Sequence, residues 1–510
     1  MMWVLAVLPL IVVLAMITGL RRPAHWAAAA GALAAVIIVW WRPEFAVPGE
    51  RLGAGAGAAG LLVLNAAAVM LPGVYLSQVL TRRGVHESLQ EWVRALPLSG
   101  PAKIALVVAG IAPTVEALTG FGVSLLVTVP VLLALAPPAT ALRQAMLGMN
   151  IMPWGTLGLA TVIGAALAGV SVTTLGTATA VTSALIFPLL TVWAALLSRP
   201  ERRLRTAVLA AGAGGVLASG LLISNRLGVV PPAGVLAGLF TSAMGLALCA
   251  LRRPRASEPS EVLAHTAAAT GNVERHHEIN REDRHGATGG LIPPRPVLHA
   301  YGLVLGGIAV LRIATAAGVA PLALHTGGAS FALLSSPGLP LLAAALLLDR
   351  GRPHLLDARA AMNRVTRPLL ALTGFVILGR LMADSGMISA LGDALANAPT
   401  MVIACAAPAL GMLSGFVTGS NVGGDVLMMS LQQDLAPTGL GTWFAALQNS
   451  AAGHTVFTSL PMIMLILAVA GDRATNAGVS EHVLLRFGLR VAAGIYLVLA
   501  AVAIMVMAVV

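Results

Sequence analysis

Glu116 is an acidic residue inside a stretch of small and apolar residues, Pro113 to Phe121, which reads P-T-V-E-A-L-T-G-F. An unpaired charge within an apolar membrane segment is costly, and carboxyl groups in such places commonly carry protons in transporters. We therefore expect Glu116 to couple transport to protons. The alternative is a structural ion pair with an arginine such as Arg380.

A second stretch, Pro408 to Phe416, repeats the first and reads P-A-L-G-M-L-S-G-F. Each copy leads into a further apolar piece and then into a segment that opens with an asparagine, Asn150 or Asn449. A single T-G-F or S-G-F would more often be a packing contact between membrane helices. The matched pair favours a ligand site, because broken helices present free amides and a dipole end to a small anion. The residues expected to bind substrate are Thr119, Gly120, Phe121, Gly122, Asn150, Ser414, Gly415, Ser420, Asn421, Asn449 and His454.

Three of the polar residues in the second half leave alternatives open. His454 could bind a carboxylate or relay protons, because imidazole titrates near neutrality, or it could simply join two helices by a hydrogen bond. Arg380 lies within an apolar run and is a candidate anion partner, although Asp384, one helical turn further on, could neutralise it. Asp425 could bind a cation, but one carboxylate without neighbouring ligands is weak evidence for a metal site. We expect no metal and no cofactor.

These residues must be positioned by membrane-spanning helices. Of the 510 residues, 58% are hydrophobic and 10% are charged, whereas soluble domains have about 25% charged residues. Apolar runs of about twenty residues, enough to cross a hydrocarbon core about 30 Å thick, recur along the chain. The predicted fold is an all-α polytopic membrane protein with about twelve transmembrane helices. The spans are expected near 2–20, 24–41, 53–80, 146–169, 172–198, 206–224, 228–251, 298–318, 329–348, 367–384, 443–470 and 487–510.

Two further stretches, 101–136 and 399–431, consist of paired short apolar pieces broken by glycine and polar residues. We predict re-entrant hairpins there, since backbone that turns at membrane depth is tolerated only where protein buries it or where it lines a watery cavity. Their predicted orientations are opposite, as in the inverted repeats of secondary transporters. The expected division is a first repeat at 1–200, connecting spans at 201–251, a polar linker at 252–297 and a second repeat at 298–510.

The basic residues give an orientation. Lysine and arginine accumulate in cytoplasmic loops, and most of the 31 basic residues, including the arginines between 350 and 367, fall on the cytoplasmic side if the N-terminus is outside. We therefore predict a bacterial inner-membrane protein with both termini outside and the linker in the cytoplasm. The linker holds His276, His277 and His285, whose irregular spacing makes metal binding the weaker interpretation.

Several ordered motifs resemble the lactate permease family. Glu116 to Gly122 is similar to its E-x-x-[ST]-G-F-G motif, Ser385 to Met387 to its S-G-M motif, and Gly419 to Asn421 to its G-S-[DN] turn. The resemblance implies proton symport of lactate or glycolate. The chain departs from the family's T-G-K-x-x-S-P run, because Gly453 to Ser459 holds no lysine, and Lys103 is the only lysine of the chain. Another group must then neutralise the substrate.

The sequence holds no nucleotide-binding loop, zinc-protease motif or paired-cysteine motif, so we expect a carrier and not an enzyme. The predicted function is secondary active transport of small monocarboxylates of the lactate or glycolate type, coupled to protons and operating by alternating access. The alternatives are a carrier for another organic or inorganic anion and, less favoured, an ion channel. The expected partners are a small carboxylate, protons and the lipid bilayer, with a homo-oligomer as an open alternative. Nucleic acid is not expected as a partner, because the basic residues sit in short loops between apolar runs.

Overall fold

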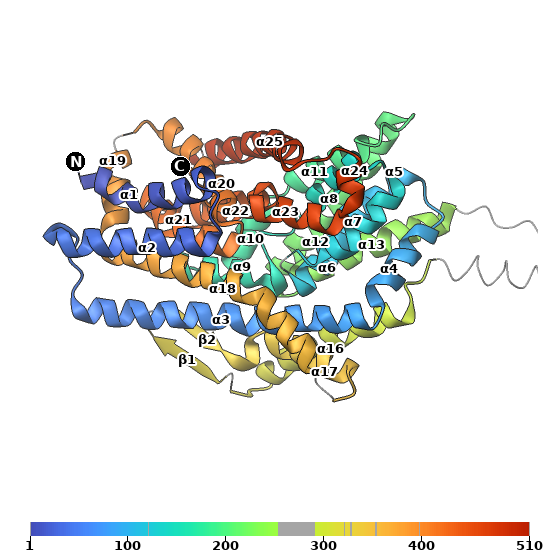
Figure 1. Cartoon of the computed structure of the whole chain (residues 1–510), viewed down its shortest axis with the longest axis horizontal. Coiled ribbons are helices and arrows are strands. Elements are labelled where there is room, and N and C mark those ends of the chain that lie inside the picture. The colour runs from blue at the N-terminus through green and yellow to red at the C-terminus, as the bar shows by residue number, and fades with distance from the viewer. Residues whose placement is uncertain are drawn as a thin grey trace, which may run out of the picture.

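The computed structural model describes residues 2–120, 122–252, 291–320, 322–326, 329–351, 354–396 and 398–508. These residues are almost entirely helical (Figure 1), which confirms the predicted all-α polytopic architecture. Within them, 10 helices are long and apolar enough to cross a membrane, or up to 12 if each of two bent helix pairs counts as one span.

The long helices run in roughly parallel and antiparallel directions along the long axis of the molecule (Figure 1). They are α1 (Met2–Leu14), which continues as the π-turn Ala15–Gly19, α2 (Ala24–Trp41), α3 (Gly49–Arg82), α12 (Arg203–Arg226), α13 (Ala233–Arg252), α16 (Arg295–Ala316), α18 (Leu355–Asp384), α20 (Thr400–Thr418) and α25 (Glu481–Ala508). A proline directly precedes α2, α3, α16 and α20. Proline suits these positions because it has no backbone N–H to leave unpaired at a helix start.

Shorter elements fill the space between the long helices. They are α4 (Val85–Ala95), α8 (Pro138–Gly148), the 3-10 turn Thr156–Gly158, α9 (Leu159–Ala168), α10 (Val172–Thr182), α11 (Ile186–Leu196), α17 (Gly338–Leu348), α19 (Met387–Ala396), α22 (Gly441–Thr455), the 3-10 turn Val456–Thr458, α23 (Leu460–Ala470) and α24 (Asp472–Asn476). Two further 3-10 turns cover Pro43–Phe45 and Leu333–Ser335. The strands β1 (Ala323–Thr326) and β2 (Ala329–Ala332) pair in antiparallel fashion, with Leu324 opposite Phe331.

Two helical hairpins lie in the stretches for which re-entrant hairpins were predicted, and the first arm of each is also long and apolar enough to cross a membrane. Hairpin 1 consists of α5 (Gly100–Leu106), the π-turn Val107–Ile111 and α6 (Ala112–Thr119), followed by α7 (Ser124–Leu135). Hairpin 2 consists of α20 followed by α21 (Asn421–Leu435). The open end of hairpin 1 lies toward α4, and that of hairpin 2 lies toward α19, near the opposite end of the long axis (Figure 1). The two tips therefore point toward the middle of the molecule.

Two broken helices pass beside the hairpins. The first is α8 and α9, separated by the non-helical segment 149–155, and the second is α22 and α23, which are bent by 41° at Ser459. The second arm of hairpin 1, α7, packs against α8 and α23, while the second arm of hairpin 2, α21, packs against α22 and α9. Each hairpin thus contacts the first half of one broken helix and the second half of the other.

Four predicted spans are wrong as continuous helices, and one of them, 443–470, is the broken helix of α22 and α23 described above. The predicted span 146–169 is interrupted where Gly155 and Gly158 have positive φ angles of 60° and 74°. The predicted span 172–198 consists of α10 and α11, and α10 turns back from α9 at 113°. The predicted span 329–348 begins as strand β2, and only the 11 residues of α17 are helical. A hydropathy window averages over such breaks, because small and apolar residues continue through them.

The remaining predicted spans correspond to helices, several of which start earlier than expected, among them α25, which starts at Glu481 instead of 487. Helix α3 starts at Gly49 instead of 53, and α18 starts at Leu355 instead of 367. The extension of α18 places Arg364 and Arg367 within a helix and not in the predicted loop. The linker prediction at 252–297 falls mostly on residues 253–290, and these, with His276, His277 and His285, lie outside the described residues.

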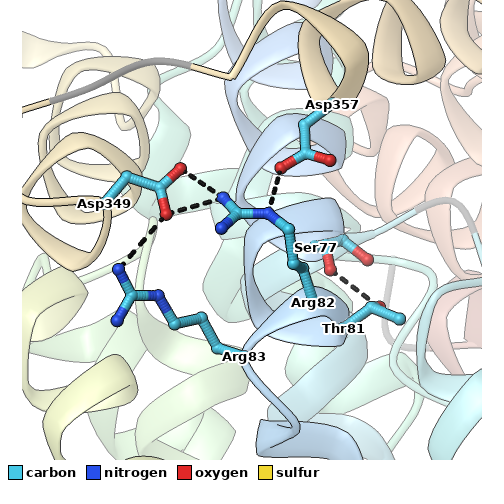
Figure 2. A network of polar contacts seen from close by, with 6 residues as sticks. All are labelled: Ser77, Thr81, Arg82, Arg83, Asp349 and Asp357. Carbon is cyan, nitrogen blue, oxygen red and sulfur yellow. Dashed lines mark hydrogen bonds and ion pairs between the residues drawn. The ribbon is translucent and has the colours of Figure 1, made fainter.

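Charged residues join α3, α17 and α18 at one end (Figure 2). Arg82 Nη2 donates to the two carboxylate oxygens of Asp349 at 2.7 and 2.6 Å, and Arg82 Nε donates to Asp357 Oδ2 at 2.8 Å. Arg83 Nη2 lies 3.5 Å from Asp349 Oδ1. Helix α3 also packs along α18 and α17. These three helices form a connected unit beside the hairpins.

Candidate functional site

A cavity of about 300 Å³ lies where the two hairpin tips meet. Hairpin 1 contributes Glu116, and hairpin 2 contributes its whole tip, from Thr418 to Gly423. The interrupted segment of the first broken helix, between Met152 and Ala160, and the start of α23 complete this side of the wall. The opposite side comes from α18 between Arg367 and Phe375, from the start of α2 and from the middle of α3.

The tip of hairpin 2 presents a helix N-terminus to this cavity. Helix α20 ends at Thr418, Gly419 turns the chain with a φ of 63°, and Ser420 Oγ accepts a hydrogen bond from Gly423 N at 3.3 Å. The first intrahelical bond of α21 is donated by Gly424 to Ser420 O. The backbone N–H groups of Asn421 and Val422 come before that bond and therefore have no partner within the helix. They form the positive end of the helix dipole, which favours anions.

The tip of hairpin 1 is organised by Glu116, whose side chain is buried. Its carboxylate accepts hydrogen bonds from Gly122 N at 3.0 Å, from Ser124 N at 3.3 Å and from Ser124 Oγ at 2.7 Å. Gly120 has a φ of 70°, and a Cβ at this position would collide with the side chain of Thr156. Glu116 thus fills the N-terminal end of α7 with a carboxylate that belongs to the chain itself.

Two asparagines connect the hairpin 2 tip to both helix breaks. Asn421 Nδ2 donates to Asn449 Oδ1 at 2.7 Å and to Pro153 O at 3.2 Å. Asn449 Nδ2 in turn donates to Thr179 Oγ1 of α10 at 3.0 Å. All these residues are buried, and Asn421 also lines the cavity. This chain of amides fixes the position of the α21 N-terminus relative to both broken helices.

A family model described as L-lactate permease matches residues 3–288 and 308–510, which include both hairpins and both broken helices. The chain belongs to the L-lactate permease family. It is therefore a multi-pass membrane transport protein, and the resemblance seen in its motifs is confirmed. No curated protein matches the chain.

Among the residues expected to bind substrate, Ser420 and Asn421 line this cavity. The other described candidates are buried away from its wall: Thr119, Gly120, Gly122, Asn150, Ser414, Gly415, Asn449 and His454. Asn150 Nδ2 donates to Val108 O at 3.2 Å, which joins the first break to hairpin 1. His454 Nε2 lies 2.9 Å from Ser183 Oγ, and the edge of its ring meets Phe187. His454 thus makes the hydrogen bond between helical segments that was the alternative to a role in substrate or proton binding. Asn449 and Thr119 are also buried, and Thr119 Oγ1 donates to Val115 O at 2.6 Å.

Ser414 and Gly415 are not at the tip of hairpin 2, contrary to the expectation from letter matching. Helix α20 continues through them for another turn, to Thr418. A Cβ on Gly415 would collide with the backbone of Ala452, so this glycine allows α20 and α22 to pack closely. Ser414 Oγ donates to Gly411 O at 2.7 Å and accepts from Gln448 Nε2 at 3.0 Å. Phe121 lies outside the described residues, and Gly122 follows it at the hairpin 1 tip with a φ of 72°.

Arg380 is not among the residues that line the cavity. Its Nη2 lies 3.1 Å from Asp384 Oδ1, so the pairing one helical turn away accounts for this arginine. Arg367, which was not among the predicted site residues, lines the cavity from the same helix. Arg364 lies about one turn before Arg367 on the same helix. The spacing of Arg364 and Arg367, directly before the apolar run, is that of neighbouring residues on one face of a helix. It could have indicated that the helix starts earlier, but both arginines were assigned to a loop.

Proposed function

We propose that this permease is a secondary active transporter of small monocarboxylates, of the lactate or glycolate type, coupled to protons and operating by alternating access. The observation that carries the proposal is the meeting of Arg367 and the α21 N-terminus in a largely apolar cavity between the two hairpin tips. A guanidinium group and free helix amides are the groups that bind a carboxylate. Apolar walls suit the short carbon chain of such an acid.

In this proposal the substrate carboxylate lies between the amides of Asn421 and Val422 and the guanidinium of Arg367. The hydroxyl of a 2-hydroxy acid lies near Ser420 and Thr156, which also line the cavity, and its alkyl group contacts Met70 and Leu372. Arg367 supplies the positive charge for which the chain has no lysine in the second helix break. In this proposal Gly120 and Gly122, which were expected to bind substrate, instead shape the opposite tip together with Glu116.

We further propose that the two halves, 1–200 and 298–510, are inverted repeats, with both termini outside the inner membrane. The opposite orientation of the two hairpins and their reciprocal packing on the two broken helices support this proposal. The hairpins and broken helices would move as one unit against α2, α3 and α18, and so expose the cavity to each side in turn. The ion pairs of Figure 2 would hold that second unit together.

Glu116 is the acidic group that this proposal places on the proton pathway. Its carboxylate accepts three hydrogen bonds from the turn that follows it. A proton on either oxygen would replace an acceptor by a donor and weaken those contacts. Protonation would then loosen the hairpin 1 tip, which connects proton binding to opening of the cavity.

Uptake by purified protein in liposomes tests the function. Labelled lactate, glycolate, acetate and a dicarboxylate are offered with and without an inward proton gradient. We expect saturable uptake of the 2-hydroxy monocarboxylates that the gradient drives above equilibrium. If no monocarboxylate moves, the substrate proposal is wrong; if movement is not saturable and appears as large currents, the protein is a channel.

A further inference from the structure

Asp425 is a buried carboxyl group that the proposed substrate site does not use. It lies in α21, one helical turn after Asn421, and its exposed fraction is 0%. Neither of its carboxylate oxygens has a hydrogen-bond partner among the described residues. Glu116, in contrast, has three donors around its carboxylate. The two buried carboxyl groups near the hairpin tips thus have opposite surroundings.

Asp425 is tightly packed, with apolar side chains and one amide group around it. A Cβ added to Gly164 of α9 would lie 3.0 Å from Asp425 Oδ2, with Leu175 and Met429 at the same place. Gln448 is the nearby amide of α22, but its Nε2 donates to Ser414 Oγ at 3.0 Å and to Gly424 O at 3.1 Å. The Gln448 carbonyl is also occupied, because it accepts from Gln432 Nε2 at 3.2 Å.

Charged side chains on the surrounding elements have other partners or positions. Helix α21 packs against α9, α18, α19, α20 and α22. On α18 Arg380 pairs with Asp384, and on α22 His454 contacts Ser183. Helix α19 carries Asp393, α20 carries Cys405, and α9 has no titratable side chain. Asp434, near the far end of α21, accepts from Ser389 Oγ at 3.3 Å. No described basic group forms an ion pair with Asp425.

An ionised carboxylate without donors or a counter-charge would cost several kcal/mol in such a place. The charge is removed if the group holds a proton. We propose that Asp425 is a proton-binding site of this transporter. The site is separate from the substrate cavity and is buried where α21 of hairpin 2 packs against α9. The inference rests on the proposed function and names a second residue for its proton coupling.

The position of Asp425 connects the proton to substrate binding. Asn421 stands at the end of α21 that would bind the substrate carboxylate, and Asp425 follows it on the same face, one turn deeper. A neutral Asp425 can stay against Gly164 and Leu175, whereas an ionised one draws water and opens the contact between α21 and α9. Loss of the proton would then loosen the same helix that holds the anion, so that both leave on one side.

The test replaces Asp425 by asparagine, which has nearly the same shape as the protonated acid and cannot ionise. In liposomes, Asp425→Asn should retain exchange of labelled for unlabelled lactate and should lose accumulation driven by a proton gradient. Asp434→Asn is the matched control, because it removes an exposed carboxylate from the same helix, and it should behave as the unmodified protein. Gradient-driven accumulation by Asp425→Asn at the unmodified level would overturn the inference.

A second measurement does not depend on this variant folding. Dicyclohexylcarbodiimide reacts with protonated carboxyl groups in apolar surroundings, so mass spectrometry of the labelled, unmodified protein should find Asp425 modified and the labelling reduced at alkaline pH. Absence of label on Asp425 while transport is intact overturns the inference. Uptake that needs sodium, with choline as the replacement, and ignores the proton gradient would also overturn it. Failure of the unmodified protein to move any monocarboxylate rejects the proposed function instead, and the labelling result still decides whether Asp425 holds a proton.

Discussion

At the scale of single residues, Arg367 and Glu116 have opposite relations to the two helix N-termini near the cavity. The N-terminus of α7 is occupied by the Glu116 carboxylate. The N-terminus of α21 has no acidic side chain of its own chain at its tip and shares the cavity with Arg367. A substrate carboxylate can therefore take at α21 the place that Glu116 takes at α7, and Arg367 supplies the compensating charge.

Replacement of Arg367 by glutamine should weaken lactate uptake strongly. Hydrogen bonds to charged groups contribute about 1.5 to 3 kcal/mol, which corresponds to a rise in KM of about tenfold to a hundredfold. Arg359→Gln on the same helix is the control, because Arg359 is exposed and does not line the cavity. The kinetics of initial uptake measure both variants. Equal KM values for the two variants would remove Arg367 from the substrate site.

Replacement of Glu116 by glutamine should abolish uptake driven by a proton gradient and spare exchange. The amide cannot change its charge, and its NH2 group faces donors where the carboxylate had acceptors. Ser124→Ala is the control, since it removes one hydrogen bond to Glu116 without changing any charge. The measurement is uptake as a function of external pH. A pH profile unchanged in Glu116→Gln would exclude Glu116 from proton coupling.

The sequence pointed to some of these residues and missed others for a physical reason. Glu116, Ser420 and Asn421 could be predicted, because polar residues within apolar stretches are expensive unless they have a function. Arg367 was missed, because an arginine next to an apolar run is usually assigned to a cytoplasmic loop. Its role depends on the extension of α18 to Leu355, which brings a charged helical turn beside the hairpin tips.

At the scale of elements, the hairpin tips depend on backbone conformations that only glycine adopts readily. Gly120 ends α6 with a φ of 70°, and its Cα faces the side chain of Thr156. The equivalent letter in the second copy, Gly415, stays helical within α20. The same motif thus ends a helix in one half and permits close helix packing in the other. The sequence repeat predicted where the hairpins are. Where each helix ends depends on packing, of Gly120 against Thr156 in one copy and of Gly415 against Ala452 in the other.

Gly120→Ala should therefore disturb hairpin 1 specifically. A non-glycine residue in this conformation costs about 1 to 3 kcal/mol, and the new methyl group would collide with Thr156. We expect a lower melting temperature and reduced transport. Gly60→Ala in α3 is the matched control, because nothing lies within 4 Å of its added Cβ, and there alanine should be neutral or slightly stabilising. Equal melting temperatures of the two variants would contradict the assigned tip conformation.

At the scale of the whole molecule, hydropathy predicted the membrane class and most long helices, but not their association. Arg82 and Asp349 are far apart in the sequence, and their contact joins α3 to α17 (Figure 2). The reciprocal packing of α7 on α23 and of α21 on α9 is equally non-local. These contacts suggest two units, the hairpins with the broken helices on one side and α2, α3 and α18 on the other. Alternating access requires that the units move relative to each other.

Helix α19 contacts α1 and α18 and is counted here with α2, α3 and α18. A disulfide between α19 and hairpin 2 would therefore join the two units and should stop transport reversibly. A Cβ on Gly392 of α19, which follows α18, would lie 3.2 Å from Asp434 Cβ of hairpin 2, close to the separation of about 3.5 to 4.5 Å found in disulfides. With Cys249 and Cys405 first replaced by serine, Gly392→Cys with Asp434→Cys should lose uptake on oxidation and regain it on reduction. The control pair is Gly57→Cys with Thr326→Cys, which joins α3 to β1 within the other unit at 3.4 Å. Because that bond leaves the two units free to move, oxidation should leave uptake unchanged. Full uptake by the oxidised Gly392–Asp434 pair would show that hairpin 2 does not move against α19 during transport.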